Sequence, residues 1–147
     1  MKTIALISCS KKKQRGDKPI CAKDLYCGAY FKKAYACVQR LHIDEIYILS
    51  AKYGLVHPDQ QIEYYDKSLN KASSAYRKKW STNVKKQLQD VGVNLAKDQL
   101  IILVGKKYYQ YIIDKIENPQ IIIVGKGLSI GKKMQLFDTL NSLNQMQ

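Results

Sequence analysis

The stretch TIALIS, residues 3–8, is the first of four short apolar runs that decide the fold of this sequence. All four runs are rich in isoleucine and valine, and none alternates cleanly between polar and apolar residues. This pattern is typical of parallel strands that are covered on both faces. We therefore expect four buried strands, at Thr3–Ser8, Glu45–Ser50, Leu100–Gly105 and Gln120–Gly125.

Stretches with helical periodicity lie between and after these runs. In the longest, Tyr76, Trp80, Val84, Leu88 and Val91 recur every three or four residues and form one stripe. The expected helices are Gly28–Leu41, Ser73–Gly92, Lys107–Ile116 and Ile130–Gln145. The alternating order predicts the α/β class with a mostly parallel sheet, and 147 residues fit a single domain, 1–147.

The chain carries a large excess of positive charge. Lysine and arginine number 25 against 12 acidic residues, which gives a net charge of +13. The electrostatic field of such a charge attracts polyanions such as nucleic acid. The alternative is a basic surface that is only solvated and binds no polyanion. No apolar run is long enough for a membrane span, and the N-terminal run ends in three lysines, so we expect a cytoplasmic protein.

Four cysteines, at positions 9, 21, 27 and 37, include no CxxC pair. We therefore expect reduced thiols, no metal site and no cofactor. Cys9 stands apart from the others because it lies at a strand end beside lysines, and we include it among the ligand-binding residues.

Small and polar residues follow each expected strand, in the segments SCSKKK (8–13), SAKYGL (50–55), GKKYY (105–109) and GKGLSIG (125–131). The carboxyl ends of parallel strands share one edge of a sheet, so these segments should meet in one cleft. Lysines neutralise phosphate, glycines let backbone amides approach it, and tyrosine rings stack on bases. The pattern favours a nucleotide site but is neither a Walker A loop nor a GxGxxG motif, and loops that only join strand to helix remain an alternative.

The candidate residues lie at these strand ends and in the two long loops, Cys9–Cys27 and Ala51–Lys71. The predicted ligand-binding residues are Ser8, Cys9, Ser10, Lys11, Lys13, Ser50, Lys52, Tyr53, Gly54, His57, Tyr65, Gly105, Tyr108, Lys126, Gly127 and Ser129. Tyr53 and Tyr65 are the preferred rings for stacking on a base. The predicted catalytic residues are Asp66, Asp24 and Lys12: an aspartate would activate water or stabilise a sugar cation, and a lysine would attack the sugar. A salt bridge is an equal alternative for either aspartate.

Four segments together resemble a family of uncharacterised bacterial and phage domains related to the YaaA peroxide-stress proteins: LISCSKKK, ILSAKYGLVHPDQQIEYYDKSL, LVGKKYYQYI and GLSIGKKMQ. The positions that match the YaaA plan are Leu49, Ser50, Tyr53, Gly54, Pro58, Asp59 and Tyr65. This chain is shorter than YaaA and lacks the insertions associated with DNA binding there.

The resemblance extends distantly to the uracil-DNA-glycosylase-like superfamily. It implies a three-layer α/β/α sandwich with a four-stranded parallel sheet in the order 2-1-3-4. The chain lacks the Gly-Gln-Asp-Pro-Tyr and His-Pro-Ser signatures of classical uracil glycosylases. In the related archaeosine synthase domain a lysine of the first-strand loop is the nucleophile, which points to Lys11, Lys12 or Lys13 without choosing among them.

These observations favour an enzyme that binds nucleic acid, DNA rather than RNA. We expect a DNA glycosylase that cleaves the N-glycosidic bond of a modified pyrimidine such as 5-hydroxymethyluracil. Two alternatives stay open: a non-catalytic DNA-binding protein of the stress or damage response, and an N-glycosidase that acts on free nucleotides. The sequence predicts no particular oligomeric state.

Overall fold

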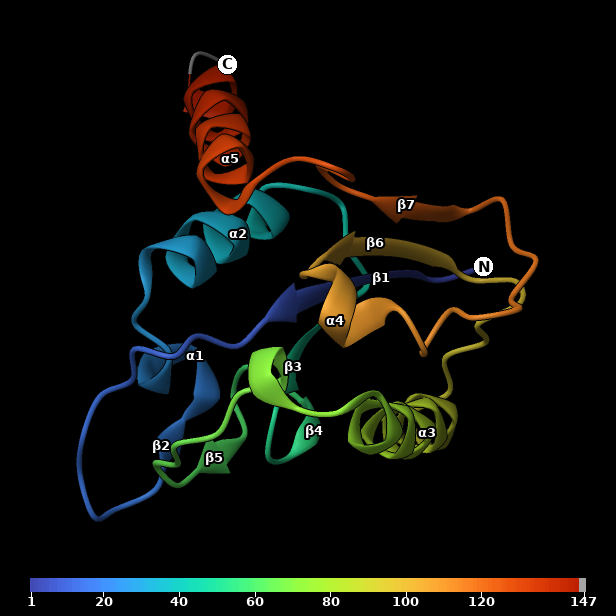
Figure 1. Ribbon diagram of the computed structural model, residues 1–147. Coiled ribbons are helices and arrows are strands. Elements are labelled where there is room, and N and C mark those ends of the chain that lie inside the picture. Colours follow the sequence, from blue (N-terminus) through green and yellow to red (C-terminus); the bar gives the residue numbers. More distant parts are fainter. Residues whose placement is uncertain (146–147) are drawn as a thin grey trace.

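The central sheet of the protein has five strands in the order β4-β3-β1-β6-β7 (Figure 1), in a computed structural model that describes residues 1–145. The parallel strands are β1 (Thr3–Ser8), β3 (Glu45–Ser50), β6 (Gln99–Leu103) and β7 (Ile121–Ile123). At one edge, β4 (Gly54–Val56) runs antiparallel to β3. The predicted class, α/β with a mostly parallel sheet flanked by helices, is confirmed.

Strand β1 is the centre of the core. It pairs with β3 along one edge and with β6 along the other, and its residues Ile4 to Ile7 are fully buried. An unbroken apolar run suits this position because both faces of the strand are covered.

Helices lie on both sides of the sheet (Figure 1). The chain crosses from β1 to β3 in one direction and from β3 to β6 in the other, so right-handed crossovers place the connecting helices on opposite faces. On one side α2 (Ala29–Gln39) packs against β1 and α5 (Ile130–Gln145), and on the other α3 (Ser74–Asp90) packs against β4 and α4 (Lys106–Tyr109).

The predicted stripe of the longest helix is partly confirmed. Trp80, Val84 and Leu88 are buried, whereas Tyr76 and Val91 near the two ends of α3 are exposed. Side chains at helix ends extend past the sheet that the middle of the helix covers, which explains the difference.

The sheet has a fifth strand that the sequence did not predict. Gly54 begins β4 with φ +75°, a backbone conformation that glycine adopts without steric cost. The Gln87 side chain of α3 then holds the turn, because its Oε1 accepts from Leu55 N (2.9 Å) and its Nε2 donates to Tyr53 O (3.1 Å).

A small second sheet ties the two long loops together. Strand β2 (Ile20–Cys21), from the loop after β1, pairs antiparallel with β5 (Gln61–Ile62), from the loop after β3. The short helices α1 (Ala22–Leu25) and η1 (Leu69–Lys71) complete these loops. The loops are therefore an ordered part of the fold that covers one end of the sheet.

One predicted helix is much shorter than expected. The sequence predicts a helix over Lys107–Ile116, but α4 ends at Tyr109 and turns follow. Lys115 has φ +62°, which no α-helix accommodates. The apolar residues of this segment fill the core from turns rather than from helical positions.

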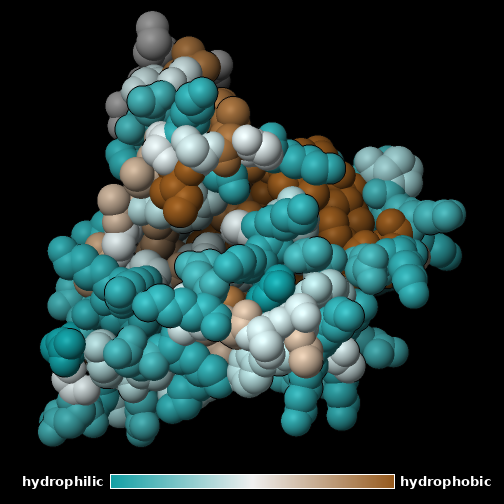
Figure 2. Space-filling model, viewed as in Figure 1, coloured by the Kyte–Doolittle hydropathy of each residue, from teal (hydrophilic) through white to brown (hydrophobic). Residues whose placement is uncertain are grey.

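The visible surface is mainly hydrophilic, as the charge predicts (Figure 2). Hydrophobic surface gathers where β6 and β7 lie below α5 in that view. Ile122 of β7, Leu128 before α5 and Ile130 at the start of α5 are exposed apolar residues. No helix within residues 1–145 has the length and apolar character needed to cross a membrane.

Candidate functional site

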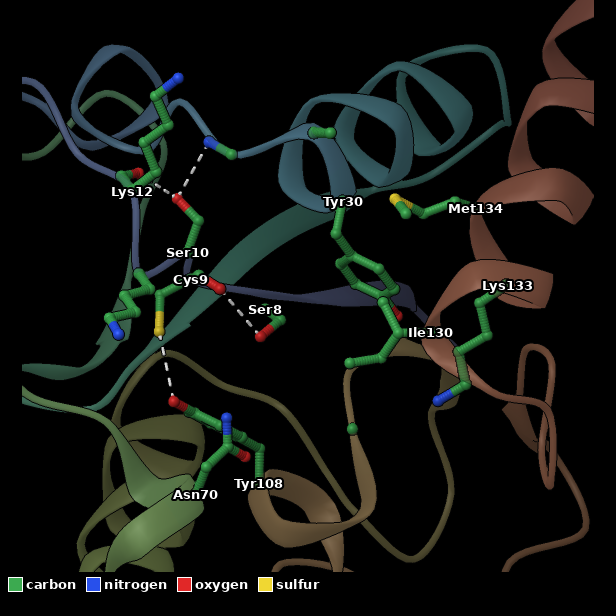
Figure 3. Close-up of a pocket in the computed structure, with 14 residues that line it drawn as sticks. Ser8, Cys9, Ser10, Lys12, Tyr30, Asn70, Tyr108, Ile130, Lys133 and Met134 are labelled. Carbon is green, nitrogen blue, oxygen red and sulfur yellow. Dashed lines mark hydrogen bonds between the residues drawn. The ribbon is translucent and has the colours of Figure 1, made fainter.

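A pocket of about 410 Å³ lies at the carboxyl ends of β1 and β6 (Figure 3). Its lining comes from the loop after β1, the starts of α2, α4 and α5, and η1: Ser8, Cys9, Ser10, Lys11, Lys12, Gly28, Ala29, Tyr30, Asn70, Gly105, Tyr108, Ile130, Lys133 and Met134. The chain leaves β1 and β6 toward opposite sides of the sheet, so the pocket occupies the switch point where open α/β sheets bind ligands.

The loop after β1 is fastened to the start of α2. Ser10 Oγ accepts a hydrogen bond from Gly28 N (3.2 Å) and donates one to Lys12 O (2.5 Å). Residue 28 must be small, because a Cβ there would lie 2.9 Å from Ser10 Cβ. This contact fixes the position of the loop after β1 relative to the start of α2 at one end of the pocket.

Two tyrosines form walls of the pocket. Tyr108 OH accepts hydrogen bonds from Leu69 N (3.3 Å) and from Cys9 Sγ (3.7 Å), and Tyr30 OH donates to Leu103 O (3.1 Å). Burial raises the pKa of the Tyr30 hydroxyl to about 12 and raises that of Tyr108 further, so both are neutral at pH 7. Their hydroxyls are engaged with the protein. The half-buried Tyr30 ring is left to contact a ligand, whereas Tyr108 is 6% exposed and packs edge-on against Trp80.

The pocket is cationic. Three lysines, Lys11, Lys12 and Lys133, belong to its lining, and none of the lining residues is acidic. The helices α2, α4 and α5, which all begin at the pocket, have no acidic residue in their first turns. Helix N-termini carry partial positive charge and usually attract carboxylates, so this end of the sheet is suited to an anionic ligand.

A smaller hollow of about 110 Å³ adjoins the pocket. It shares Ser8, Cys9, Ser10, Lys11, Asn70 and Tyr108 with the pocket and adds Lys67 and Ser68. Lys11 therefore borders both spaces, whereas Lys12 borders only the larger one. Figure 3 shows the Lys12 side chain extending away from Tyr108 and Lys133.

The structure brings together one part of the predicted site. Seven predicted residues line the pocket: Ser8, Cys9, Ser10, Lys11, Lys12, Gly105 and Tyr108. They come from the ends of β1 and β6, the two strands on either side of the switch point.

The other predicted residues lie outside the pocket lining: Asp24, Asp66, Lys13, Ser50, Lys52, Tyr53, Gly54, His57, Tyr65, Lys126, Gly127 and Ser129. Asp24 and Asp66 are exposed on the loops. Lys126 and Gly127 belong to the exposed turn before α5, and Ser129 Oγ accepts from Lys132 N (3.2 Å) at the start of that helix.

Tyr65 and Ser50 belong to a buried hydrogen-bond network. Tyr65 OH lies 2.6 Å from Tyr26 OH and accepts from Ser50 Oγ (2.8 Å). Lys13 Nζ lies 4.5 Å from the centre of the Tyr65 ring, and burial lowers the pKa of this lysine. Only 5% of Tyr65 is exposed, so in this structure the ring packs in the core and does not face a base.

Tyr53 and its neighbours lie on a separate part of the surface. The Tyr53 ring packs edge-on against Tyr65, and Lys52 Nζ lies 5.2 Å from the Tyr53 ring centre. His57 Nδ1 accepts from Asp59 N (3.1 Å), and Asp59 also pairs with Lys23 (2.7 Å), which lowers the pKa of the Asp59 carboxyl. These contacts fix the loop after β3.

Sequence reasoning missed half of the pocket lining: Gly28, Ala29, Tyr30, Asn70, Ile130, Lys133 and Met134. A sequence signal was present for two of them, since Gly28 begins a predicted helix and Lys133 lies in the quoted segment GLSIGKKMQ. No sequence signal marks Asn70, which tertiary packing of η1 brings to the pocket.

Within residues 1–145, no group of three or more His, Cys, Asp or Glu residues lies close enough together to hold a metal ion. The four cysteines are free thiols.

Comparison with known proteins gives one assignment. No curated protein matches the chain. The family of unknown function DUF6884 matches residues 4–139, which span all five strands of the sheet and most of α5, so the chain belongs to this family.

Proposed function

We propose that the protein binds nucleic acid, accommodates one nucleotide in the pocket at the ends of β1 and β6, and cleaves its N-glycosidic bond. The observation that carries this proposal is the lining of the pocket, which combines three lysines and two tyrosines with no carboxylate. A volume of about 410 Å³ is within the range of small-ligand sites and admits one nucleotide, not a duplex.

The charge of the whole molecule supports a nucleic-acid partner. A net charge of +13 attracts a phosphate backbone, whereas a single free nucleotide needs only the local charge of a pocket. A base in a duplex would have to leave the stack to enter the pocket. Tyr30 would then contact the base or sugar, because it lines the pocket and is only partly buried.

A distant relation to uracil-DNA-glycosylase-like proteins is part of the same proposal. The parallel strands follow the order β3-β1-β6-β7, which is compatible with the fold that the resemblance implied.

The lining favours lysine chemistry over water activated by an aspartate. Asp24 and Asp66 are both outside the pocket, whereas Lys11 borders the pocket and the adjoining hollow. In this reaction the neutral amine of lysine bonds to C1′, and the C1′–N bond breaks with its electron pair going to the base, which takes up a proton. The lysine nitrogen of the adduct gives up a proton, and the C1′–O4′ bond of the sugar ring then breaks with its electron pair going to O4′, which takes up a proton. This leaves a protonated imine between lysine and C1′, and water adds to C1′ and releases the lysine amine.

Oligonucleotides with modified bases test this proposal. Duplexes carrying uracil or 5-hydroxymethyluracil are incubated with the protein, and alkali then reveals abasic sites as strand breaks. Borohydride, which reduces an imine, should trap a covalent complex with the wild-type protein. Lys11→Met should abolish trapping and keep DNA binding. Lys12→Met shows how much of the trapping depends on the other lysine of the loop. Lys18→Met, at an exposed position outside the pocket, is the matched control.

The outcomes separate the candidates. Activity lost in Asp66→Asn but kept in Lys11→Met and Lys12→Met would contradict the lysine route and favour activated water. DNA binding without base release from any substrate would favour the non-catalytic alternative. Base release from mononucleotides alone would favour the N-glycosidase.

A further inference from the structure

Lys133 differs from the other lysines of the pocket because it is buried. Only 9% of its surface is exposed, whereas Lys11 and Lys12 are exposed. Its methylene groups cover Gly125, where a Cβ would lie 3.0 Å from Lys133 Cγ. Figure 3 shows the side chain leaving α5 on the side of Ile130, with its amine in the pocket region.

The Lys133 amine has no partner in the protein. Within residues 1–145 it makes no ion pair and no side-chain hydrogen bond, although other lysines at helix starts and loops do, such as Lys107 Nζ with Asn70 O (2.6 Å). The methylene stem of Lys133 is covered by the protein, but Nζ is not among the fully buried atoms of the described residues that lack a partner, so the amine itself is reached from the pocket. A ligand that carries negative charge into the pocket would therefore find a fixed cation with no competing partner in the described part of the protein.

The position of Lys133 in its helix is unusual for a cation. Lys132 and Lys133 lie in the first turn of α5, next to the positive end of the helix dipole, where cations are disfavoured. Helix α5 therefore begins with a lysine pair at positions that usually favour acidic residues, which fits an anion bound beside Lys133.

We propose that Lys133 is the phosphate-binding residue of the pocket. Its amine binds a phosphate group of the nucleotide, and Ile130, Met134 and Tyr30 beside it form the apolar wall for the sugar or base. The first turn of α2 has no side-chain cap, and its residues Ala29 and Tyr30 line the same pocket, so backbone N–H groups are available there to the ligand. This inference rests on the proposed nucleotide pocket but not on the proposed reaction.

Calorimetric titration at fixed ionic strength tests the role of Lys133. The probes are deoxyuridine, its 5′-monophosphate, and a short single-stranded oligonucleotide with or without a 5′-phosphate. Lys133→Met keeps most of the side-chain length over Gly125 and removes the charge. Lys132→Met makes the same change at the neighbouring exposed residue and is the matched control.

We expect Lys133→Met to weaken binding of the monophosphate at least about tenfold, the effect of losing one hydrogen bond to a charged group. Lys132→Met should change it by about twofold at most. Deoxyuridine should bind weakly and equally to all three proteins. The two oligonucleotides show which kind of phosphate Lys133 binds. If Lys133→Met weakens binding only of the oligonucleotide with a 5′-phosphate, Lys133 binds the phosphate at a strand end. If it weakens binding of both, Lys133 binds a phosphodiester.

Thermal denaturation shows that the variant folds. Without ligand, Lys133→Met should melt close to the wild-type temperature, since methionine keeps most of the buried stem and the lost amine has no partner within residues 1–145. Equal monophosphate binding by wild type and Lys133→Met would overturn the inference, and so would the absence of monophosphate and oligonucleotide binding by the wild type. Loss of borohydride trapping in Lys133→Met with unchanged binding would also overturn it and make Lys133 the nucleophile. Lys133-dependent binding without base release would keep the inference and refute the proposed reaction.

Discussion

Replacement of Tyr65 by phenylalanine should destabilise the protein while leaving its pocket intact. The substitution removes one hydroxyl with two partners, Tyr26 OH at 2.6 Å and Ser50 Oγ at 2.8 Å. Burial raises the pKa of both tyrosines, so the network consists of neutral hydroxyls. The ring and its packing remain, which isolates the contribution of the hydrogen bonds.

The magnitude follows from what each partner loses. A buried polar group left without a partner costs about 1–3 kcal/mol. Ser50 Oγ keeps its bonds from the backbone N–H groups of Lys52 (3.2 Å) and Tyr53 (3.0 Å), so it loses only its acceptor. Tyr26 OH loses its short hydrogen bond with Tyr65. We expect Tyr65→Phe to lower the free energy of unfolding by about 2–4 kcal/mol.

A double-mutant cycle sharpens this prediction. Tyr26→Phe should cost about 1 kcal/mol, because Tyr65 OH still accepts from Ser50. The double variant should cost less than the sum of the two, since the orphaned Tyr26 hydroxyl is then absent. Residues in one hydrogen-bond network couple by about 0.5–3 kcal/mol.

Urea denaturation, followed by fluorescence and analysed at constant m value, measures these differences. Tyr76→Phe, on the exposed part of α3, is the control and should stay within about 0.5 kcal/mol of wild type. A Tyr65→Phe variant as stable as the control, or strictly additive tyrosine variants, would refute the reasoning. Nucleotide binding by Tyr65→Phe should equal that of wild type, because the ring lies outside the pocket lining.

Three further outcomes follow from individual contacts and from charge. Gly54→Ala should destabilise the fold by about 1–3 kcal/mol in the same assay, because φ is +75° and the new Cβ would lie 2.3 Å from Gln87 Oε1. Hydrogen bonds from the backbone N–H groups of Asn94 and Lys2 lower the pKa of Asp98, so this carboxylate adds stability above its unfolded pKa and loses it as the pH falls through the lowered native value. Melting temperatures measured from about pH 5 to pH 3 should therefore fall less in Asp98→Asn than in wild type. The logarithm of the DNA association constant should fall linearly with that of salt concentration, and a flat dependence would contradict a phosphate-backbone contact.

The fold class could be predicted because the strongest signals are local. Continuous apolar runs identify buried parallel strands, and β1 and β3 have the predicted bounds. The edge strand β4 and the β2–β5 pair have only two or three residues each, too few to show a period. Their pairing depends on contacts between distant segments, such as the Gln87 side chain that holds the turn at Gly54.

The site residues at strand ends could be predicted from the sequence, whereas those whose position depends on tertiary packing could not. The ends of β1 and β6 supply Ser8 to Lys12, Gly105 and Tyr108, as the rule for parallel sheets implies. Tyr65 has the same loop context as a ligand-facing tyrosine, but its hydroxyl finds partners in the core. A tyrosine suits both environments, so residue type alone could not separate them.

The proposed reaction and the proposed phosphate contact lie in different parts of one pocket. Lys11 belongs to the loop after β1, and Lys133 belongs to α5 on the far side of the pocket from that loop. A phosphate held at Lys133 would fix the position of the sugar relative to the attacking amine, and such positioning accelerates a reaction between bound groups. Borohydride trapping at saturating substrate should therefore be faster when the substrate carries a phosphate that reaches Lys133, and this difference should vanish in Lys133→Met. Equal trapping rates with and without this lysine would show that the two parts of the pocket act independently.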